Sequence, residues 1–358
     1  MDAYDDSVKH MRKQTIVVND IAASPGGGLT VLREFYDAVT KRTEDMEWVF
    51  LLSKPYIEET ENVKVVLLPE IKKHFNRVLF DSLTGWKTID PYHPSAVFSL
   101  QNTVVSHCKG KKVTYVHQPL PFQKVKTYSF LKKEEFRFAC IQHLLGKRII
   151  ESIKQSDLSI VQTKWMKEAV EELCPKANVK QIYPGFPLIP YRAEYVTTKE
   201  FFYPTSDVPY KNNEMLIDAA KKLRNEGLEL KTALTVEGED AGIDFLGRIP
   251  SDEVYRRYVR SCLVFPSYIE TFGYPLIEAR TTGSIILASD CPFSHELLDG
   301  YENAYFFDPF DQTELEDQMR KVASGEISRK DTTCAPKAET YMNTWDQVID
   351  EILAVARE

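Results

Sequence analysis

The sequence predicts an α/β protein of two domains, each built on a doubly wound parallel β-sheet. Short apolar runs rich in Val, Ile, Leu and Phe alternate with helical patterns along the chain. Several runs are apolar at consecutive positions, which is typical of strands buried on both faces of a parallel sheet. Because the strand–helix alternation occurs twice, we expect two sheets that face each other across a cleft.

Thirteen segments have the composition of strands. Seven lie in the first half: 14–21, 47–53, 63–69, 96–102, 112–118, 158–163 and 179–185. Six lie in the second half: 200–206, 231–238, 243–249, 262–267, 284–290 and 304–309. Helical patterns occupy 30–42, 212–227, 251–261 and 340–358. We expect Ser251 to cap its helix at the N-terminus and Gly227 to end the preceding one.

A length of 358 residues suits two domains of roughly 150 residues each. The segment 183–199 is rich in Pro and aromatic residues, so we place an N-terminal domain at 1–190 and a C-terminal domain at 191–338. Residues 339–358 read as a helix that packs back on the first domain. Its apolar face holds Trp345, Val348, Ile349, Ile352 and Leu353.

The net charge of −8 is distributed unevenly. Residues 1–190 carry 27 Lys and Arg against 22 Asp and Glu, whereas residues 191–358 carry 18 against 31. So acidic a second half would repel a phosphate backbone, and we expect no nucleic-acid partner. None of the six cysteines lies at a metal-ligand spacing, so no metal site is expected.

Two further features concern location. No apolar run approaches the roughly 18 to 20 residues that span a membrane. The polar N-terminus lacks the apolar centre of a secretion signal. We therefore expect a cytoplasmic protein.

The segment 24–32, SPGGGLTVL, places Gly26, Gly27 and Gly28 between the first strand and its helix. Glycines let a ligand approach the backbone, and a helix N-terminus favours an anion. A tight strand-to-helix turn without a ligand fits the same residues. The run is not GxGxxG, which argues against a nicotinamide-dependent oxidoreductase.

Two single residues are candidates by position. His117 ends a strand and precedes a Pro-rich turn, so we expect its imidazole at the cleft edge. Lys211 lies in the loop 204–213, where a cation beside a helix N-terminus would neutralise a diphosphate. On its own, each is explained more simply as a structural or exposed residue.

The segment 265–290 holds two carboxylates, Glu270 and Glu278. Glu270 follows a buried strand, and Glu278 lies on a helix with Pro275 in its first turn. This spacing suits hydrogen bonds from hydroxyls at different points along one polyol ligand. A loop glutamate and a solvated helix glutamate are the alternative.

Together these segments resemble glycosyltransferase family 4, which has the GT-B fold of two Rossmann-like domains. The resemblance runs through GGGL, HQPLPF, SDLSIVQTKWMK and YPGFP to the C-terminal helix. Its most specific stretch is 245–290. It implies an acceptor-side first domain and a second domain that binds a nucleotide-sugar donor.

The resemblance also implies roles for individual residues. Glu270 would contact hydroxyls of the transferred sugar, and Glu278 would hold the ribose. Lys211 would steady the leaving diphosphate, and His117 would lie near the donor sugar. The backbone N–H groups that would help to bind sugar and diphosphate are those of Thr271, Phe272 and Gly273. Gly27 and Gly28 match a loop close to the donor phosphate.

The chain departs from this family at Ser206, where an Arg is usual. A diphosphate then has one cation fewer. Arg248 would compensate, or the donor is held differently, or activity is weaker. A catalytically silent member that binds a sugar is therefore an alternative, as is a nucleotide-sugar epimerase of the same fold.

The resemblance implies a retaining, metal-independent transfer without a cofactor, in surface polysaccharide biosynthesis. The acceptor would be a glycan or a polyprenyl-diphosphate-linked glycan. Residues 109–154 hold 11 Lys and Arg, three acids and interleaved aromatic residues. This segment is equally suited to an anionic membrane surface, with peripheral binding at the inner face, and to an ordinary amphipathic helix.

Overall fold

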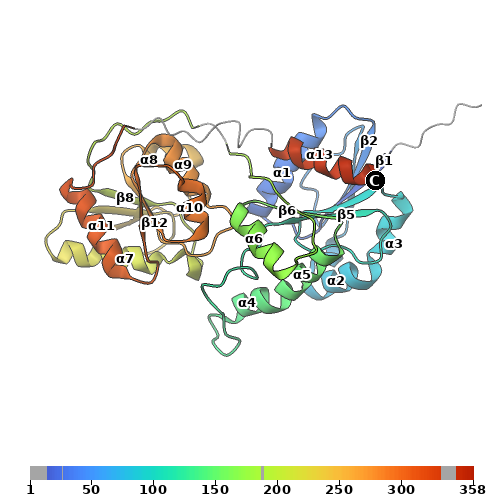
Figure 1. The fold of residues 1–358 in the computed structure, drawn as a ribbon, viewed down its shortest axis with the longest axis horizontal. Coiled ribbons are helices and arrows are strands. Elements are labelled where there is room, and N and C mark those ends of the chain that lie inside the picture. Colours follow the sequence, from blue (N-terminus) through green and yellow to red (C-terminus); the bar gives the residue numbers. More distant parts are fainter. Residues whose placement is uncertain (1–13, 26, 187–188, 332–343) are drawn as a thin grey trace, which may run out of the picture.

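A computed structural model gives the structure of residues 14–25, 27–186, 189–331 and 344–358. It consists of two parallel sheets flanked by helices, one in each half of the chain (Figure 1). The first sheet has the strand order β3-β2-β1-β4-β5-β6-β7, and the second has the order β10-β9-β8-β11-β12-β13. The predicted pair of doubly wound parallel sheets is confirmed.

The strands of the first sheet are β1 (Gln14–Asp20), β2 (Met46–Leu52), β3 (Val63–Leu67), β4 (Ala96–Ser99), β5 (Lys111–Val116), β6 (Leu158–Val161) and β7 (Val179–Gln181). Those of the second sheet are β8 (Glu200–Tyr203), β9 (Lys231–Leu234), β10 (Ile243–Phe245), β11 (Cys262–Phe265), β12 (Ile286–Ser289) and β13 (Ala304–Phe307). Each of the thirteen predicted strand segments coincides with one of these strands, and β2 and β5 begin one residue earlier than predicted.

The α-helices of the first half are α1 (Gly27–Thr40), α2 (His74–Leu79), α3 (Trp86–Ile89), α4 (Phe136–Ala139), α5 (Gly146–Gln155) and α6 (Lys164–Leu173). Those that follow are α7 (Asn213–Asn225), α8 (Ser251–Tyr258), α9 (Tyr274–Thr282), α10 (Pro292–Leu298), α11 (Gln312–Ser324) and α13 (Thr344–Arg357). Short 3₁₀ turns are η1 (Pro69–Lys72), η3 (Asp90–Tyr92) and η5 (Pro209–Lys211). Two turns of π-helix are η2 (Phe80–Thr84) and η4 (Cys140–Leu145).

Two helix starts differ from the prediction. α1 begins at Gly27, so Gly27 and Gly28 lie in its first turn and not in a loop before it. Ser251 is the first residue of α8 and not its cap, because Pro250, in an extended conformation, occupies the N-cap position without a side-chain hydrogen bond. Gly227 follows α7 with φ +92°, as expected of a glycine that ends a helix.

The first sheet is buried on both faces. On one face α1 and α13 cover it (Figure 1). There Phe35 packs against the rings of Trp48, Phe98 and Trp345. The apolar face of α13 is buried in this same core, which places the C-terminal helix on the first sheet. The other face packs against η2 and α3 through Phe80 and Ile89.

The two halves of the chain meet at the N-terminus of α6. The hydroxyl of Thr163 and the indole N–H of Trp165 donate to the carbonyl of Thr271, at 2.9 and 3.3 Å. Glu296 of α10 accepts the backbone N–H groups of Lys164 and Trp165, at 2.8 and 3.0 Å. These contacts bring the carboxyl end of β6 against the loop that follows β11.

Two further observations concern the described residues as a set. The five cysteines among them are free thiols. No described helix is both long enough and apolar enough to cross a bilayer.

Candidate active site

Both sheets have a point where the strand order reverses, between β1 and β4 in the first and between β8 and β11 in the second. Ligands of such sheets bind beyond the carboxyl ends of the strands at that point. Gly27 follows β1 and His117 follows β5, beside the first reversal. Lys211 follows β8 and Glu270 follows β11, at the second.

Lys211 and Glu270 are brought into direct contact. The ammonium group of Lys211 forms an ion pair with Oε1 of Glu270, and both side chains are mostly buried. The ammonium also lies 5.9 Å from the centre of the Phe265 ring. The pair therefore places one cation and one carboxylate side by side at the carboxyl edge of the second sheet.

One oxygen of Glu270 remains available. Oε1 also accepts the hydroxyl of Ser267 at 2.7 Å, and among the described residues no contact goes to Oε2. The carbonyl of Tyr210 accepts the Tyr268 N–H at 3.1 Å, which ties the Lys211 turn to the Glu270 loop. Glu270 is thus held firmly through one oxygen, with the other open to a hydroxyl donor.

The turn from Thr271 to Gly273 leads directly into α9. Gly273 has φ +93°, a left-handed conformation that favours glycine, and it is the N-cap of the helix. The N–H groups of Thr271 and Gly273 donate to no other residue that the structure describes. Phe272 is buried against the Tyr183 and Tyr274 rings. This helix end therefore presents N–H groups where an anion would bind.

Glu278 lies one turn further along α9 and is half-buried. Its Oε2 accepts the hydroxyl of Tyr258 at 2.8 Å, which leaves Oε1 for another donor. Burial raises the pKa of Glu278 to about 6, and the hydrogen bond from Tyr258 opposes that rise. Glu278 is therefore an acceptor whose charge changes just below neutral pH.

His117 is held by Asn102, a residue that the sequence analysis did not single out. Asn102 accepts the backbone N–H of His117 through Oδ1 at 2.7 Å, and its Nδ2 lies 3.2 Å from Nε2 of the imidazole. Since Oδ1 is the acceptor, Nδ2 donates, and Nε2 must accept. The proton of the neutral ring is thereby assigned to Nδ1.

The Nδ1 atom of His117 is buried and has no partner among the described residues. Burial lowers the pKa of His117 to about 4, so the ring is neutral at pH 7. A buried N–H donor without an acceptor costs about 1–3 kcal/mol. An oxygen atom of a ligand in the cleft would satisfy it.

Neither the packing nor the backbone conformation requires a glycine at position 27 or 28. A Cβ atom added at either position would meet no atom within 4 Å, and neither has a positive φ. The open space and the missing side chains leave this backbone accessible to a ligand. Gly26 lies outside the described residues.

Ser206 and Arg248 line one cavity of about 510 Å³ beside the ends of β8 and β9. Ser206 is exposed, and its carbonyl accepts the Nδ2 group of Asn213 at 3.0 Å. Arg248 is also exposed, and among the described residues none pairs with its guanidinium. The position without the usual Arg therefore shares its cavity with an available guanidinium.

The two halves of the site approach each other at Tyr274. The pKa of its hydroxyl is raised by burial and by the nearby Tyr115 and Glu34 of the first domain, with Glu278 contributing from the second. Tyr274 was not predicted as a site residue. Its position directly after the TFG turn could have identified it as a site residue, because the first residue of a helix that follows a strand end lies near the cleft.

Two polar residues at the end of β1 also escaped prediction. Both side-chain polar atoms of Asn19 are buried and have no hydrogen-bond partner within the part of the chain that the structure describes. Burial raises the pKa of Asp20 to about 7, and Lys72 and Arg77 oppose that rise. The signal was an Asn-Asp pair closing an otherwise apolar strand, since buried polar groups need partners.

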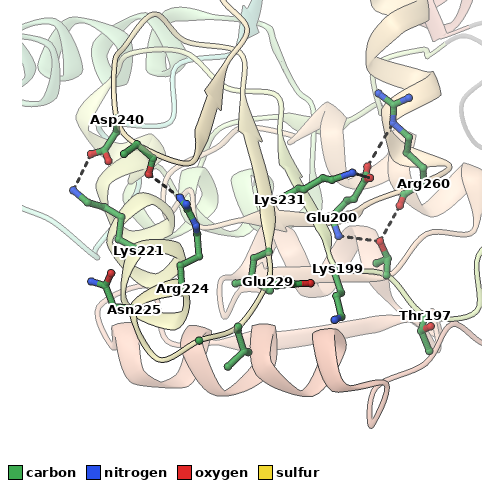
Figure 2. Close-up of a pocket in the computed structure, with 15 residues that line it drawn as sticks. Thr197, Lys199, Glu200, Lys221, Arg224, Asn225, Glu229, Lys231, Asp240 and Arg260 are labelled. Carbon is green, nitrogen blue, oxygen red and sulfur yellow. Dashed lines mark hydrogen bonds and ion pairs between the residues drawn. The ribbon is translucent and has the colours of Figure 1, made fainter.

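A larger hollow of about 920 Å³ lies at the opposite edge of the second sheet, at the amino ends of β8 and β9 (Figure 2). Several of its charged groups are paired with one another. Lys221 contacts Asp240 at 2.8 Å, and Glu200 contacts Lys231 at 3.1 Å. Because ligands of such sheets bind at the other edge, this hollow is not the candidate site.

Comparison with known proteins bears on the second domain first. Residues 191–338 match the family model "Glycosyl transferases group 1". This match covers the half that carries Lys211, Glu270 and Glu278. No curated protein matches the sequence significantly.

Solved structures resemble the whole chain. The lipopolysaccharide outer core galactosyltransferase WaaB has a TM-score of 0.67 at 15% identity, covering 95% of this chain and 99% of WaaB. Sucrose-phosphate synthase from Thermosynechococcus elongatus has a TM-score of 0.64 at 15% identity, covering 96% and 97%. Anabaena HepE in complex with UDP and glucose has a TM-score of 0.61 at 15% identity, covering 95% and 99%. At these identities the likeness shows the fold, and the predicted GT-B fold is confirmed.

The low pKa of His117 predicts a pH-dependent loss of stability. The unfolded chain binds a proton near pH 6.5 and the folded chain near 4, so stability falls as pH drops between these values. The native protein should lose about 2 kcal/mol more than His117→Gln between pH 7 and pH 5. Urea unfolding at both pH values measures this difference. His107→Asn, at an exposed histidine, should follow the native profile, and equal profiles for the native protein and His117→Gln would refute the assignment.

Proposed function

We propose that this protein is a retaining glycosyltransferase that moves a sugar from a nucleotide-sugar donor to a glycan or lipid-linked glycan. The observation that carries the proposal is the Lys211–Glu270 pair at the reversal point of the second sheet, next to the N-terminus of α9. The match of this domain to a glycosyltransferase family model supports it. So does the likeness to HepE, which has been solved with UDP-glucose.

The donor would lie along the second domain. Its diphosphate would accept hydrogen bonds from the Thr271 and Gly273 N–H groups and face the charge of Lys211. The free oxygen of Glu270 would accept a sugar hydroxyl, and Glu278 would accept the ribose hydroxyls. Arg248 would supply the second cation in place of the Arg that Ser206 replaces. A diphosphate would thus be neutralised by this chain's own cations, without a divalent metal or a cofactor.

The proposed reaction exchanges one bond at the sugar. The bond between C1 and the diphosphate oxygen breaks, and the acceptor oxygen bonds to C1 on the same face. The acceptor proton passes to the departing diphosphate, so no side chain needs to act as a covalent nucleophile. Lys211 and the α9 N–H groups stabilise the charge that develops on the leaving group. Nδ1–H of His117 would donate to a sugar or phosphate oxygen on the first-domain side.

Ser206 favours a second candidate, a silent member that binds a nucleotide sugar without transferring it. With one cation fewer, the leaving diphosphate is less stabilised in the transition state than in the family pattern. The ion pair with Glu270 also draws part of the Lys211 charge away from the phosphate. Turnover measurements separate the two candidates.

Removal of either partner of the central pair should strongly slow nucleotide release. With UDP-, GDP-, dTDP- and ADP-sugars, one donor should release its nucleotide, and Glu270→Ala and Lys211→Ala should each lower the rate about a hundredfold. Lys221→Ala is the matched control, because Lys221 is ion-paired at the opposite edge of the same sheet. Unchanged rates in both site variants would sink the proposed site. Donor binding without release from any sugar, with acceptor glycans present, would favour the silent member.

The raised pKa of Glu278 predicts a pH-dependent affinity for the donor. The ionised carboxylate accepts ribose hydroxyls, and protonation near pH 6 removes that form. The donor KM should therefore rise about tenfold from pH 7 to pH 5. Glu278→Gln should have a higher KM at pH 7 and a flat profile, whereas Glu302→Gln, at an exposed position, should behave as native. The same slope in native and Glu278→Gln enzyme would contradict this role.

We also propose that the first domain binds an anionic membrane at the cytoplasmic face, where a lipid-linked acceptor for surface polysaccharide would be presented. Within 109–154, Leu131, Phe136 and Leu144 are exposed, Leu131 almost fully. Several basic residues there are paired with acids, and Phe122 and Tyr128 are buried, so only part of the segment suits a membrane. Nearby Phe75 and Leu83, before and within η2, extend the exposed apolar surface.

The membrane proposal predicts co-sedimentation with vesicles that contain anionic phospholipid, at low salt. Leu131→Asp combined with Phe136→Asp should reduce the bound fraction several-fold, about as expected for two lost apolar anchors. Leu173→Asp on α6 is the control, because Leu173 is a similarly exposed apolar residue outside the segment. No sedimentation of the native protein at low salt would remove the proposal.

A further inference from the structure

The first domain contains a second cavity, of about 320 Å³, between the two helical segments that include π-helical turns. Arg77 and Asp81 line it from α2 and η2, and Ile141, Leu144 and Arg148 line it from η4 and α5. Its mouth lies among exposed apolar side chains, including Val78 and Leu144. No residue of the proposed donor site lines it.

The charges at the base of this cavity are not balanced. Asp81 is almost fully buried and accepts from Thr103 at 2.9 Å and from Arg148 at 3.5 Å. The Arg77 guanidinium makes no hydrogen bond or ion pair with any described residue. Among the described residues Arg148 is thus the guanidinium in contact with Asp81, whereas Arg77 lies near Asp81 and Asp20 without contacting either and is available to an anion.

The two arginines lie close enough to influence each other. Burial lowers the pKa of Arg77. Asp81 opposes this change, the positive charge of Arg148 adds to it, and Asp20 opposes it more weakly. Burial raises the pKa of Asp81 to about 6 and that of Asp20 to about 7, which weakens both of the negative charges near Arg77. An anionic group bound between the guanidiniums would relieve this repulsion and form charge-assisted hydrogen bonds.

Two π-helical turns, η2 and η4, line this cavity. In η2 the N–H of Gly85 reaches back to the carbonyl of Phe80 at 2.8 Å, a wider turn than in an α-helix. η4 makes a second such turn on the opposite wall and ends at Gly146. Turns of π-helix are rare and occur often at functional sites. Two of them around one cavity, together with the free guanidinium, indicate a ligand site.

We propose that this cavity binds the phosphate or diphosphate headgroup of a single-chain lipid. The headgroup would lie against Arg77 and Arg148, and the chain against Val78, Ile141 and Leu144. A guanidinium pair suits a dianionic phosphate or a diphosphate better than the single charge of a phosphodiester. The narrow volume suits one chain.

The site lies directly behind the proposed catalytic cleft. Gln101 and Thr103 both donate to Asp81, at 3.3 and 2.9 Å. Asn102, between them, contacts the imidazole of His117. A headgroup bound at Arg77 would thus be fixed relative to His117 by three consecutive residues. That the lipid carries the acceptor glycan rests on the proposed function, but its binding is measurable without transfer.

Titration calorimetry with farnesyl diphosphate tests the site directly. The native chain should bind it more tightly than inorganic diphosphate. Arg77→Gln should weaken binding about tenfold or more, because a charge-assisted contact is lost. Lys73→Gln is the matched control, because Lys73 is an exposed cation just before α2, outside the cavity, and should change the affinity less than about twofold.

A second variant tests the apolar wall. Leu144→Gln, at an exposed position that tolerates substitution, should weaken binding of farnesyl diphosphate but not of inorganic diphosphate. Equal affinity of both ligands for the native chain, or undiminished binding by Arg77→Gln, would overturn the proposal. Arg77-dependent binding of two-chain phosphatidylglycerol vesicles without binding of farnesyl diphosphate would also overturn it. Glu270→Ala should bind the lipid as the native chain does, so failure of sugar transfer and failure of this site are separate results.

Discussion

The N-terminus of α6 is a polar joint that helps to align the two domains, beside the packing of Phe138 on Tyr210. The first N–H groups of a helix have no partner within it, and here those of Lys164 and Trp165 donate to Glu296 of the other domain. Thr163, the N-cap residue, donates its hydroxyl to Thr271 and not to its own helix. Separation of the domains would exchange these hydrogen bonds for hydrogen bonds to water, at a net cost of about 1 kcal/mol each. Since Thr271 also begins the turn into α9, the joint and the proposed diphosphate site are continuous.

Much of the fold was predictable because parallel strands that are buried on both faces consist of uninterrupted apolar residues. The strand β11, Cys262–Phe265, is buried at every position and stood out for that reason. The start of α1 was not predictable, because three glycines indicate a turn by propensity although the structure continues as helix from Gly27. The π turn η2 has no local signal. A Cβ at Gly85 would lie 2.7 Å from Val105, so tertiary packing decides its course.

The candidate site was predictable as single residues and not as contacts. Glu270 and Lys211 were identified separately, 59 positions apart, and only the adjacency of β8 and β11 makes them an ion pair. The sequence analysis gave them different ligand groups, a sugar hydroxyl and the diphosphate. In the structure each fixes the position of the other. Asn102 was missed because its contact with His117 depends on a left-handed backbone conformation, φ +68°. Asn tolerates this conformation, but an Asn in a sequence does not by itself predict it.

The loop from Gln101 to Thr103 explains how the two halves of the first domain can act together. Its outer residues hold the buried carboxylate of Asp81, and Gln101 also accepts the N–H of Ala22, ahead of the glycines that open α1. Its central residue, Asn102, orients the imidazole of His117. Because the polar side chains of all three residues are buried and paired, moving one contact would leave others unsatisfied. An anion bound beside Asp81 and the two arginines would therefore also stabilise the loop backbone that orients His117. Lipid binding would thus be linked to the geometry of the cleft without any large motion.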